Sequence, residues 1–351
     1  MPSLLDLPAD LAPLQSLLER SLVRVERRFD EQLVCDLPPV NRLCEHVEQY
    51  RGKMLRPMLV VLCGLACRAA DPASATDESN DSGVTDDHIA VAAVCEMIHM
   101  ATLVHDDVLD EADTRRKGGT INRLHGNEAA VILGDYLFSA AYQLCSGIPG
   151  QVGRDASLLI GQTGMTLCAG ELLQLEHRGD YSIDEPVYFE IVKRKTASLI
   201  AAACRLGATL SEGPGGPQAP RLDQVGLKLG VAFQIQDDLL DLTGNQEIVG
   251  KSLGKDVALG KLTLPIIHHL ATAPAIKRGQ TLSILRQYGE FAQAPSELLR
   301  VALDSTESIG YARGTAQNLV AESKVLLDEL PDSAAKVYLH AMADAVINRA
   351  S

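Results

Sequence analysis

Long segments in which apolar residues recur with helical spacing make up most of this sequence, and only a few short polar stretches interrupt them. Alternating runs of Val, Ile and Thr, the usual material of β-strands, are few. Aromatic residues make up 4% of the chain, and Trp is absent. The 351 residues suffice for one large domain or two ordinary ones. We therefore predict an all-α protein.

Two segments break the helical pattern most clearly. Residues 71–87 are acidic and almost without apolar side chains, and residues 211–220 contain three prolines and three glycines. We predict surface loops at both places. Segments that carry chemistry lie on both sides of residue 215 and look complementary, so we favour a single domain over residues 1–351.

Charge, cysteine spacing and missing motifs exclude several classes of protein. Acidic residues outnumber basic ones by 46 to 32, and a net charge of −14 does not suit binding to a nucleic-acid backbone. The eight cysteines form no CxxC pair, which argues against a zinc or redox site. Neither HExxH nor a strand-linked GxGxxG is present. Neither a signal peptide nor a run of about 18 uninterrupted apolar residues is found, so we expect a cytoplasmic protein without a transmembrane segment.

The motif DDxxD occurs twice, each time at the end of a long apolar run. The copies are Asp106-Asp107-Val108-Leu109-Asp110 and Asp237-Asp238-Leu239-Leu240-Asp241. On a helix the first and last Asp of each copy share a face, roughly 6 Å apart. Two carboxylates at that separation repel by roughly 2–3 kcal/mol at an effective dielectric of about 20, so such a face needs water or a cation.

A lone acidic motif usually marks a solvated helix face. Here the flanking segments are apolar on all sides and the motif is doubled, so we expect the carboxylates to line an interior cleft. Carboxylate oxygens suit Mg²⁺, which keeps several waters and shares its remaining positions with substrate phosphates. Basic residues follow both motifs, at Arg115–Lys117 and at Lys251, Lys255 and Lys261. The pattern predicts a diphosphate site.

Further polar residues extend these two helix faces. His99 and Thr102 share the face of Asp106 and Asp110, and Gln234 precedes the second motif by one turn. This alignment favours a site role for His99 over that of a core histidine.

In their order along the chain, the motifs resemble those of the all-trans polyprenyl diphosphate synthases, within the isoprenoid synthase superfamily. The resemblance covers roughly residues 40–350. It rests on GKMLRP at 52–57, EMIH at 96–99, HDDVLDEADTRR at 105–116, GDYLFSAA at 134–141, GE with Gln174 at 170–174, KTA at 195–197, FQIQDDLLDLTG at 233–244, GKSLGKD at 250–256 and GKLTLP at 260–265.

The resemblance implies an isoprenoid synthase fold, a single bundle of ten or more helices around a central cavity, usually as a homodimer. The two Asp motifs would face each other across the mouth of that cavity. Three Mg²⁺ ions would be held by Asp106, Asp110, Asp237 and Asp241, with Asp107 and Asp238 behind them. The enzyme would condense an allylic diphosphate with isopentenyl diphosphate.

Substrate-binding residues are also implied by the resemblance. The isopentenyl diphosphate site would comprise Lys53, Arg56, His99 and Arg116. The allylic side would comprise Arg115, Lys195, Thr196, Gln234, Lys251 and Lys261. There the Thr196 carbonyl and the Gln234 side-chain oxygen would stabilise the allylic cation, and the released diphosphate would take the proton.

The resemblance also bears on the length of the product. In the family, bulk at the fourth or fifth residue before the first motif stops chain growth early. Those positions are Thr102 and Ala101, both small, so we expect a long-chain product, suited to a quinone side chain and delivered to a membrane. Leu137 and Ala141 are candidates for the floor of the tunnel.

Three alternatives stay open. A geranylgeranyl or farnesyl diphosphate synthase would make a shorter product. A terpene cyclase or head-to-head condensing enzyme would not need the isopentenyl site of Lys53, Arg56 and His99. A non-catalytic subunit of the same fold would tolerate the loss of either Asp motif, and both are intact.

Overall fold

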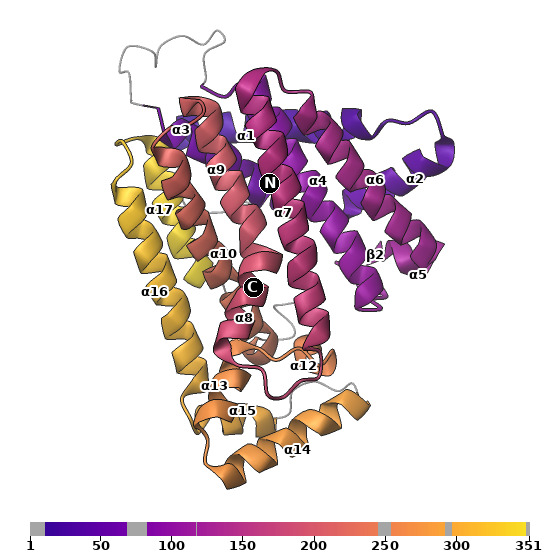
Figure 1. Ribbon diagram of the computed structural model, residues 1–351, viewed down its shortest axis with the longest axis vertical. Helices are drawn as coiled ribbons and strands as arrows, with labels where there is room; N and C mark the ends of the chain where they lie inside the picture. The colour runs from indigo at the N-terminus through magenta and orange to yellow at the C-terminus, as the bar shows by residue number, and fades with distance from the viewer. Residues whose placement is uncertain (1–10, 69–82, 117, 245–253, 292–296, 349–351) are drawn as a thin grey trace. The chain divides into compact units, whose positions relative to one another are not determined.

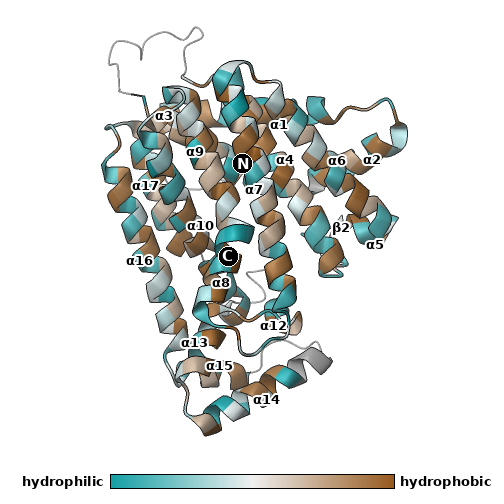
Figure 2. Ribbon diagram, viewed as in Figure 1, coloured by the Kyte–Doolittle hydropathy of each residue, from teal (hydrophilic) through white to brown (hydrophobic). Residues whose placement is uncertain are grey.

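The computed structural model is almost entirely helical (Figure 1), which confirms the all-α prediction. It describes residues 11–68, 83–116, 118–244, 254–291 and 297–348. Along most of the helices hydrophilic and hydrophobic residues alternate (Figure 2), as expected where one face packs inside and the other meets water.

Helices account for nearly all regular structure within these ranges. They are α1 (Ala12–Leu33), α2 (Pro38–Val47), α3 (Leu55–Ala66), α4 (Asp86–Leu109), α5 (Ile121–His125), α6 (Asn127–Ser146), α7 (Gly150–Glu176), α8 (Glu185–Val192), α9 (Ser198–Glu212), α10 (Gln218–Thr243), α12 (Lys255–Ala258), α13 (Leu264–Thr272), α14 (Ala275–Phe291), α15 (Glu297–Asp304), α16 (Ser308–Asp328) and α17 (Ala334–Ile347). A 3₁₀ turn covers Glu48–Tyr50 and a π-helical turn covers Lys193–Ala197. Strand β1 (Thr114–Arg115) pairs antiparallel with β2 (Gly118–Gly119).

The chain forms two compact units that alternate along the sequence. Unit 1 comprises Met1–Gly164, Leu199–Gln224 and Leu326–His340. Unit 2 comprises Met165–Ser198, Val225–Val325 and Ala341–Ser351. The first Asp motif belongs to unit 1 and the second to unit 2. No boundary between the units falls within residues 211–220. That the whole chain forms a single domain stays a prediction.

Helices extend into both predicted loops. Thr85 caps α4 by accepting a hydrogen bond from the His88 N–H at 3.3 Å, and Asp86 and Asp87 suit the positive end of the helix dipole, so α4 begins inside the acidic segment. Residues 71–82 of that segment lie outside the described residues. In the second loop α10 begins at Gln218, because Pro220 is tolerated in a first helical turn.

Helix α4 is the core helix of unit 1. By length and composition it is apolar enough to cross a membrane, although it contains no uninterrupted apolar run of about 18 residues. Glu96 and His99 interrupt its apolar run, but its mean hydropathy stays as high as that of a membrane-spanning helix. Because 78% of the apolar window is buried inside the structure, α4 has the burial of a core helix.

Glycines bring α3, α4 and α9 into close contact. A Cβ at Gly207 on α9 would overlap the carbonyl oxygen of Val60 on α3. A Cβ at Gly64 would lie 2.5 Å from Nε2 of His88 on α4. The His88 ring joins the helices at this junction, since its Nε2 lies 3.1 Å from the Ser211 hydroxyl at the end of α9. Burial lowers the pKa of His88 to about 4, so the ring is neutral at pH 7.

Replacing Gly207 tests this close approach. Gly207→Ala is expected to lower the free energy of unfolding by about 1–3 kcal/mol, because the new methyl group overlaps backbone atoms of α3. The matched control is Gly161→Ala on α7, where no described atom lies within 4 Å of the new Cβ. That change should stabilise the protein by about 0.5–1 kcal/mol through helix propensity. Denaturant unfolding of both variants is the measurement, and equal shifts would contradict the packing.

Candidate active site

Asp107, the middle residue of the first motif, is held by Arg115. The Arg115 Nε donates to both carboxylate oxygens at 3.0 Å, and Nη2 donates to Oδ1 at 2.7 Å. Asp107 is buried, and the guanidinium meets it because the chain turns back after α4 into the β1–β2 hairpin. The carboxylates of Asp106 and Asp110, on either side, are half-buried. Arg115 therefore balances the one fully buried charge of this motif.

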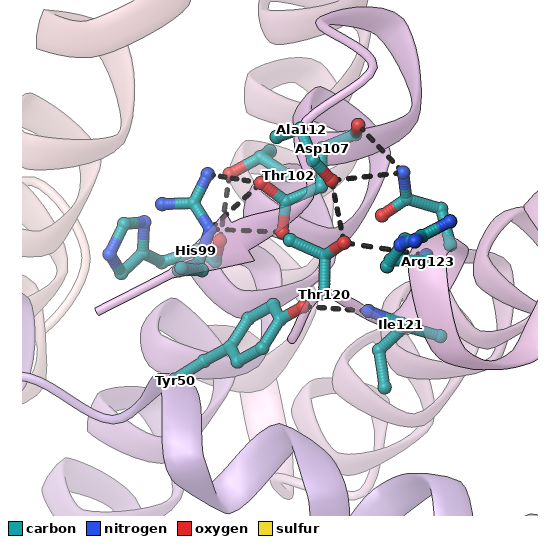
Figure 3. Close-up of polar contacts among 10 residues, drawn as sticks. Tyr50, His99, Thr102, Asp107, Ala112, Thr120, Ile121 and Arg123 are labelled. Atoms are coloured by element: carbon teal, nitrogen blue, oxygen red, sulfur yellow. Dashed lines mark hydrogen bonds and ion pairs between the residues drawn. The ribbon is translucent and has the colours of Figure 1, made fainter. Parts of the chain in front are cut away.

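The turn after the first motif is tied together by further hydrogen bonds (Figure 3). The Asn122 amide donates to the carbonyl oxygens of Asp107 and Ala112, each at 3.2 Å, and the Thr120 hydroxyl donates to Ala112 at 2.6 Å. Tyr50 lies beneath this turn, where its hydroxyl accepts the Ile121 N–H at 3.0 Å. Burial raises the pKa of Tyr50 to about 12. The turn is thereby fixed against both α5 and the segment before α3.

Basic side chains gather around His99 in unit 1. Burial lowers the pKa of His99 well below its ordinary value, and the positive charges of Arg56, Arg115 and Arg116 lower it further. His99 is therefore neutral at pH 7. Glu96, one turn earlier on α4, is buried, and burial raises its pKa although the positive charge of Arg56 opposes the shift. The structure thus brings Arg56, His99 and Arg116 together.

One atom of this cluster lacks a partner. The Nε of Arg56 is buried and makes no hydrogen bond within the described part of the chain. A buried guanidinium N–H without an acceptor is costly, and a phosphate oxygen is a suitable acceptor. Gly52 also matters here, because a Cβ at that position would overlap the Arg116 guanidinium. Lys53 is exposed and stands next to Gly52 in the sequence.

In unit 2, Asp238 is the buried middle residue of the second motif. Its Oδ2 accepts the Tyr188 hydroxyl at 2.6 Å, and its Oδ1 accepts the Gln234 amide N–H at 2.8 Å. The Gln234 side-chain oxygen accepts the Thr196 hydroxyl at 2.9 Å. Burial raises the pKa of Asp238 well above its usual range, and the nearby charge of Asp256 raises it further. The structure therefore brings Thr196, Gln234 and the second motif together.

Lys195 lies in the π-helical turn that follows α8. Its ammonium pairs with the carboxylate of Glu171 on α7, and the Gln174 amide donates to the same carboxylate at 3.3 Å. A Cβ at Gly170 would come within 2.8 Å of the Lys195 backbone nitrogen, so this glycine permits the close contact. π-Helical turns occur frequently at functional sites. Glu171 thus holds Lys195 in its place.

The chain after the second motif folds back onto Asp241. The backbone N–H groups of Lys255 and Asp256 each donate to its carboxylate at 3.2 Å, and the Gly254 N–H donates to its carbonyl oxygen at 2.9 Å. Burial raises the pKa of Asp241, and these N–H groups oppose the shift. The Lys261 N–H donates to the Asp256 carbonyl oxygen at 2.8 Å. Lys251 lies outside the described residues.

The acidic residues fit a hard divalent cation whose coordination shell is completed by phosphate oxygens. All their donors are carboxylate oxygens, and burial penalises the charge of Asp238 and Asp241, which a nearby cation would offset. Among the described residues no three acidic, His or Cys side chains gather closely enough to hold a metal ion unaided. Mg²⁺ characteristically takes one or two carboxylates and completes its shell with water and phosphate oxygens.

The positions that we connected with product length lie on α4 and α6, which pack against each other. Ala101, Leu137 and Ala141 are fully buried. Thr102 is half-buried, and its hydroxyl donates to the His99 carbonyl oxygen at 2.8 Å, so its polar group is turned back onto α4. Ala101 and Thr102 are therefore small, and neither offers a polar group beyond the helix.

Replacing Asp107 tests its pairing with Arg115. Asp107→Asn keeps the shape but removes the charge, so we expect a loss of about 1–3 kcal/mol in the free energy of unfolding. Glu31→Gln is the control, since its pair with Arg27 is exposed and should matter by less than about 0.5 kcal/mol. Thermal unfolding measures both, and similar small effects would contradict the role assigned to the buried pair.

Comparison with known proteins gives matches over most of the chain. A family model described as polyprenyl synthetase matches residues 38–299. The octaprenyl diphosphate synthase of Escherichia coli K12 is 31% identical over 341 residues, with 97% of this chain and 99% of that protein covered. The geranylgeranyl diphosphate synthase of Methanosarcina mazei is 30% identical over 328 residues, covering 93% and 94%.

A solved structure agrees with these relatives. The polyprenyl synthase from Caulobacter crescentus, crystallised with calcium and isoprenyl diphosphate, superimposes with a TM-score of 0.82 at 29% identity. The match covers 96% of this chain and 97% of that one. The likeness therefore spans both compact units and both Asp motifs.

Proposed function

Because this chain belongs to the polyprenyl synthetase family and is a trans-prenyltransferase, we propose that it condenses an allylic diphosphate with isopentenyl diphosphate in a Mg²⁺-dependent reaction. Members of this family use these two kinds of substrate and generally depend on divalent metal ions. One observation carries the proposal. In both Asp motifs protein side chains hold the buried middle carboxylate, while the carboxylates on either side are only half-buried.

We assign metal binding to Asp106, Asp110, Asp237 and Asp241, with three ions for each set of substrates. When bound, Mg²⁺ offsets the negative charge that develops on the departing diphosphate. Asp107 and Asp238 do not bind metal in this assignment, because Arg115, Tyr188 and Gln234 occupy their oxygens.

On the allylic side, Arg115, Lys195, Lys251 and Lys261 bind the diphosphate that leaves. Glu171 pairs with the Lys195 ammonium and holds it in place, which makes Lys195 unsuited to be the base. The Thr196 carbonyl and the Gln234 side-chain oxygen stabilise the allylic cation by presenting negative ends of dipoles. The released diphosphate accepts the proton that is lost after the new bond forms.

Lys53, Arg56, His99 and Arg116 bind isopentenyl diphosphate. The unpartnered Nε of Arg56 supports this assignment, since it offers a donor to a phosphate oxygen. A neutral His99 still has one ring N–H to donate and adds no charge to a cluster that already holds three guanidinium groups.

A long-chain product is the proposal for chain length. It is supported by Ala101 and Thr102, neither of which places bulk before the first motif. The relatives include both octaprenyl and geranylgeranyl diphosphate synthases, so a shorter product is the second candidate. A quinone side chain in a membrane is the proposed destination of a long product, released by a cytoplasmic enzyme.

A homodimer is the proposed oligomeric state. Large apolar side chains stand on the outer faces of α6 and α7, where Ile132, Tyr142 and Leu158 are 68%, 53% and 63% exposed. Several large exposed apolar side chains are consistent with a surface that a second copy covers.

The metal assignment predicts loss of turnover without loss of folding. Asp106→Ala and Asp237→Ala should each lower kcat by about a hundredfold or more, and EDTA should abolish elongation, because each removes negative oxygens or cations from the ionising site. Asp86→Ala is the control and should leave kcat unchanged, because Asp86 stands at the opposite end of α4 with an exposed side chain. Radiolabelled isopentenyl diphosphate incorporation measures all of these. Substantial elongation in excess EDTA or by either motif variant would refute the assignment.

The two substrate sites should respond separately. Arg56→Ala and His99→Ala are expected to raise the KM for isopentenyl diphosphate by about tenfold or more, because this diphosphate is bound but not cleaved. Lys195→Ala should chiefly impair the allylic substrate. Initial rates with each substrate varied in turn provide the measurement, and the variants serve as controls for each other. The reverse pattern would mean that the two sites have been exchanged.

Product length tests the role of Ala101. Ala101→Phe is expected to shorten the product to about three or four isoprene units, because the ring blocks the growing tail and leaves the diphosphates untouched. Ala101→Ser, with a side chain of similar size, is the control. Chromatography of the dephosphorylated products measures the ladder of products, that is, the distribution of their chain lengths. An unchanged ladder in Ala101→Phe, or a wild type that stops at the farnesyl stage, would contradict the long-chain proposal.

A further inference from the structure

We propose that Tyr188 is a positioning residue of the condensation, which acts through Asp238 to fix the orientation of the Gln234 amide. The inference rests on the proposed function, in which the Gln234 oxygen stabilises the allylic cation. Tyr188 lies on α8, 5% exposed and fifty residues from Asp238 in sequence. No feature of the local sequence around Tyr188 indicates this contact.

Three hydrogen bonds in a row connect Tyr188 to the residues assigned to the cation. Tyr188 donates to Asp238 at 2.6 Å, Gln234 donates to Asp238 at 2.8 Å, and Thr196 donates to Gln234 at 2.9 Å. Each oxygen of Asp238 accepts one of these hydrogen bonds, so both carboxylate oxygens have a donor. Asp238 is only 4% exposed, which leaves water little access to replace either donor.

The direction of these bonds fixes which end of the amide points where. A primary amide has a donor NH₂ group at one end and an acceptor oxygen at the other. Because Asp238 accepts, the NH₂ end of Gln234 is drawn toward it, and the oxygen end faces Thr196. Thr196 uses one lone pair of that oxygen and a second remains for the cation. A reversed amide would set two acceptor oxygens against each other and present its electropositive NH₂ group to the cation.

The Tyr188 hydroxyl is what holds the Asp238 carboxylate in this orientation. Without it, Oδ2 of Asp238 is left without its donor in a buried position, which is costly. Rotation of the carboxylate then lets either oxygen accept the hydrogen bond from the Gln234 NH₂ group, and the amide is held less firmly. The ring of Tyr188 also packs edge-on against the Phe189 ring, with the two ring centroids 5.4 Å apart. Tyr188→Phe therefore keeps the packing and removes only the donor.

Steady-state kinetics of Tyr188→Phe are the first test. We expect kcat to fall about tenfold or more, while the KM for isopentenyl diphosphate stays within about twofold, because the change acts on the cation and not on binding. Tyr311→Phe is the matched control, since the Tyr311 hydroxyl also donates to a carboxylate in unit 2, that of Glu185 at 2.8 Å, but in an exposed position. Its kcat should stay within about twofold of wild type.

A fluorinated allylic substrate separates positioning from loss of folded enzyme. Fluorine near the reacting carbon withdraws electrons and slows ionisation, so the ratio of rates with the natural and fluorinated substrates reports how well the protein stabilises the cation. A smaller folded fraction scales both rates equally and leaves the ratio unchanged. We expect the ratio to rise about threefold or more in Tyr188→Phe and to stay constant in Tyr311→Phe.

A double-mutant cycle tests whether Tyr188 acts through Gln234. In a Gln234→Leu background, Tyr188→Phe should change kcat by less than about twofold, because no amide remains to be oriented. Should Tyr188→Phe fold poorly, Asp238→Asn replaces it: its amide can donate as well as accept, so it no longer sets the direction, and the rate ratio should rise in the same way.

Two results would overturn the inference. One is an unchanged kcat and rate ratio in Tyr188→Phe while the wild type elongates normally. The other is an equal loss on Tyr188→Phe with and without Gln234. A wild-type protein that makes no condensation product contradicts the proposed function instead, so the two failures are distinguishable.

Discussion

The burial of carboxylates at the ends of two apolar helices is the constraint on which the rest of this structure depends. A carboxylate taken out of water needs either hydrogen-bond donors or a cation. The two motifs meet this need for their middle residues in different ways. Asp107 receives a charged guanidinium from the hairpin that follows it, whereas Asp238 receives a hydroxyl and an amide from residues distant in sequence. In both motifs a buried, anchored carboxylate holds the end of the helix, and the carboxylates on either side face a less buried environment.

Glycines leave room for two of the basic residues that we assign to substrate binding. Gly52 leaves room for the guanidinium of Arg116, and Gly170 lets α7 reach the π-helical turn that carries Lys195. A side chain at either position would push away a residue that the proposed reaction needs. The glycines of the sequence motifs therefore act through packing, while the charged residues beside them act on the substrates.

The sequence predicted what depends on local pattern. The all-α class follows from the helical spacing of apolar residues. That the outer carboxylates of each DDxxD motif share a helix face follows from their spacing of four residues. Tyr188 and Tyr50 were not predicted, because each acts on a residue distant in sequence and neither stands in an unusual local pattern. Glu171 stood in one of the sequence motifs, but its pairing with Lys195 was not predicted. The start of α4 within the acidic segment was also missed, since the cap at Thr85 depends on a single side-chain hydrogen bond.

The central claim is that the outer carboxylates of both motifs bind divalent ions together with a diphosphate and not alone. Calorimetric titration of the wild type with Mn²⁺, with and without a farnesyl thiolodiphosphate that ionises very slowly, tests it most directly. The account predicts an affinity for Mn²⁺ at least about tenfold higher when the diphosphate analogue is present, because phosphate oxygens complete the metal shell. Equal affinity with and without the analogue, or no Mn²⁺ binding in its presence, would contradict it.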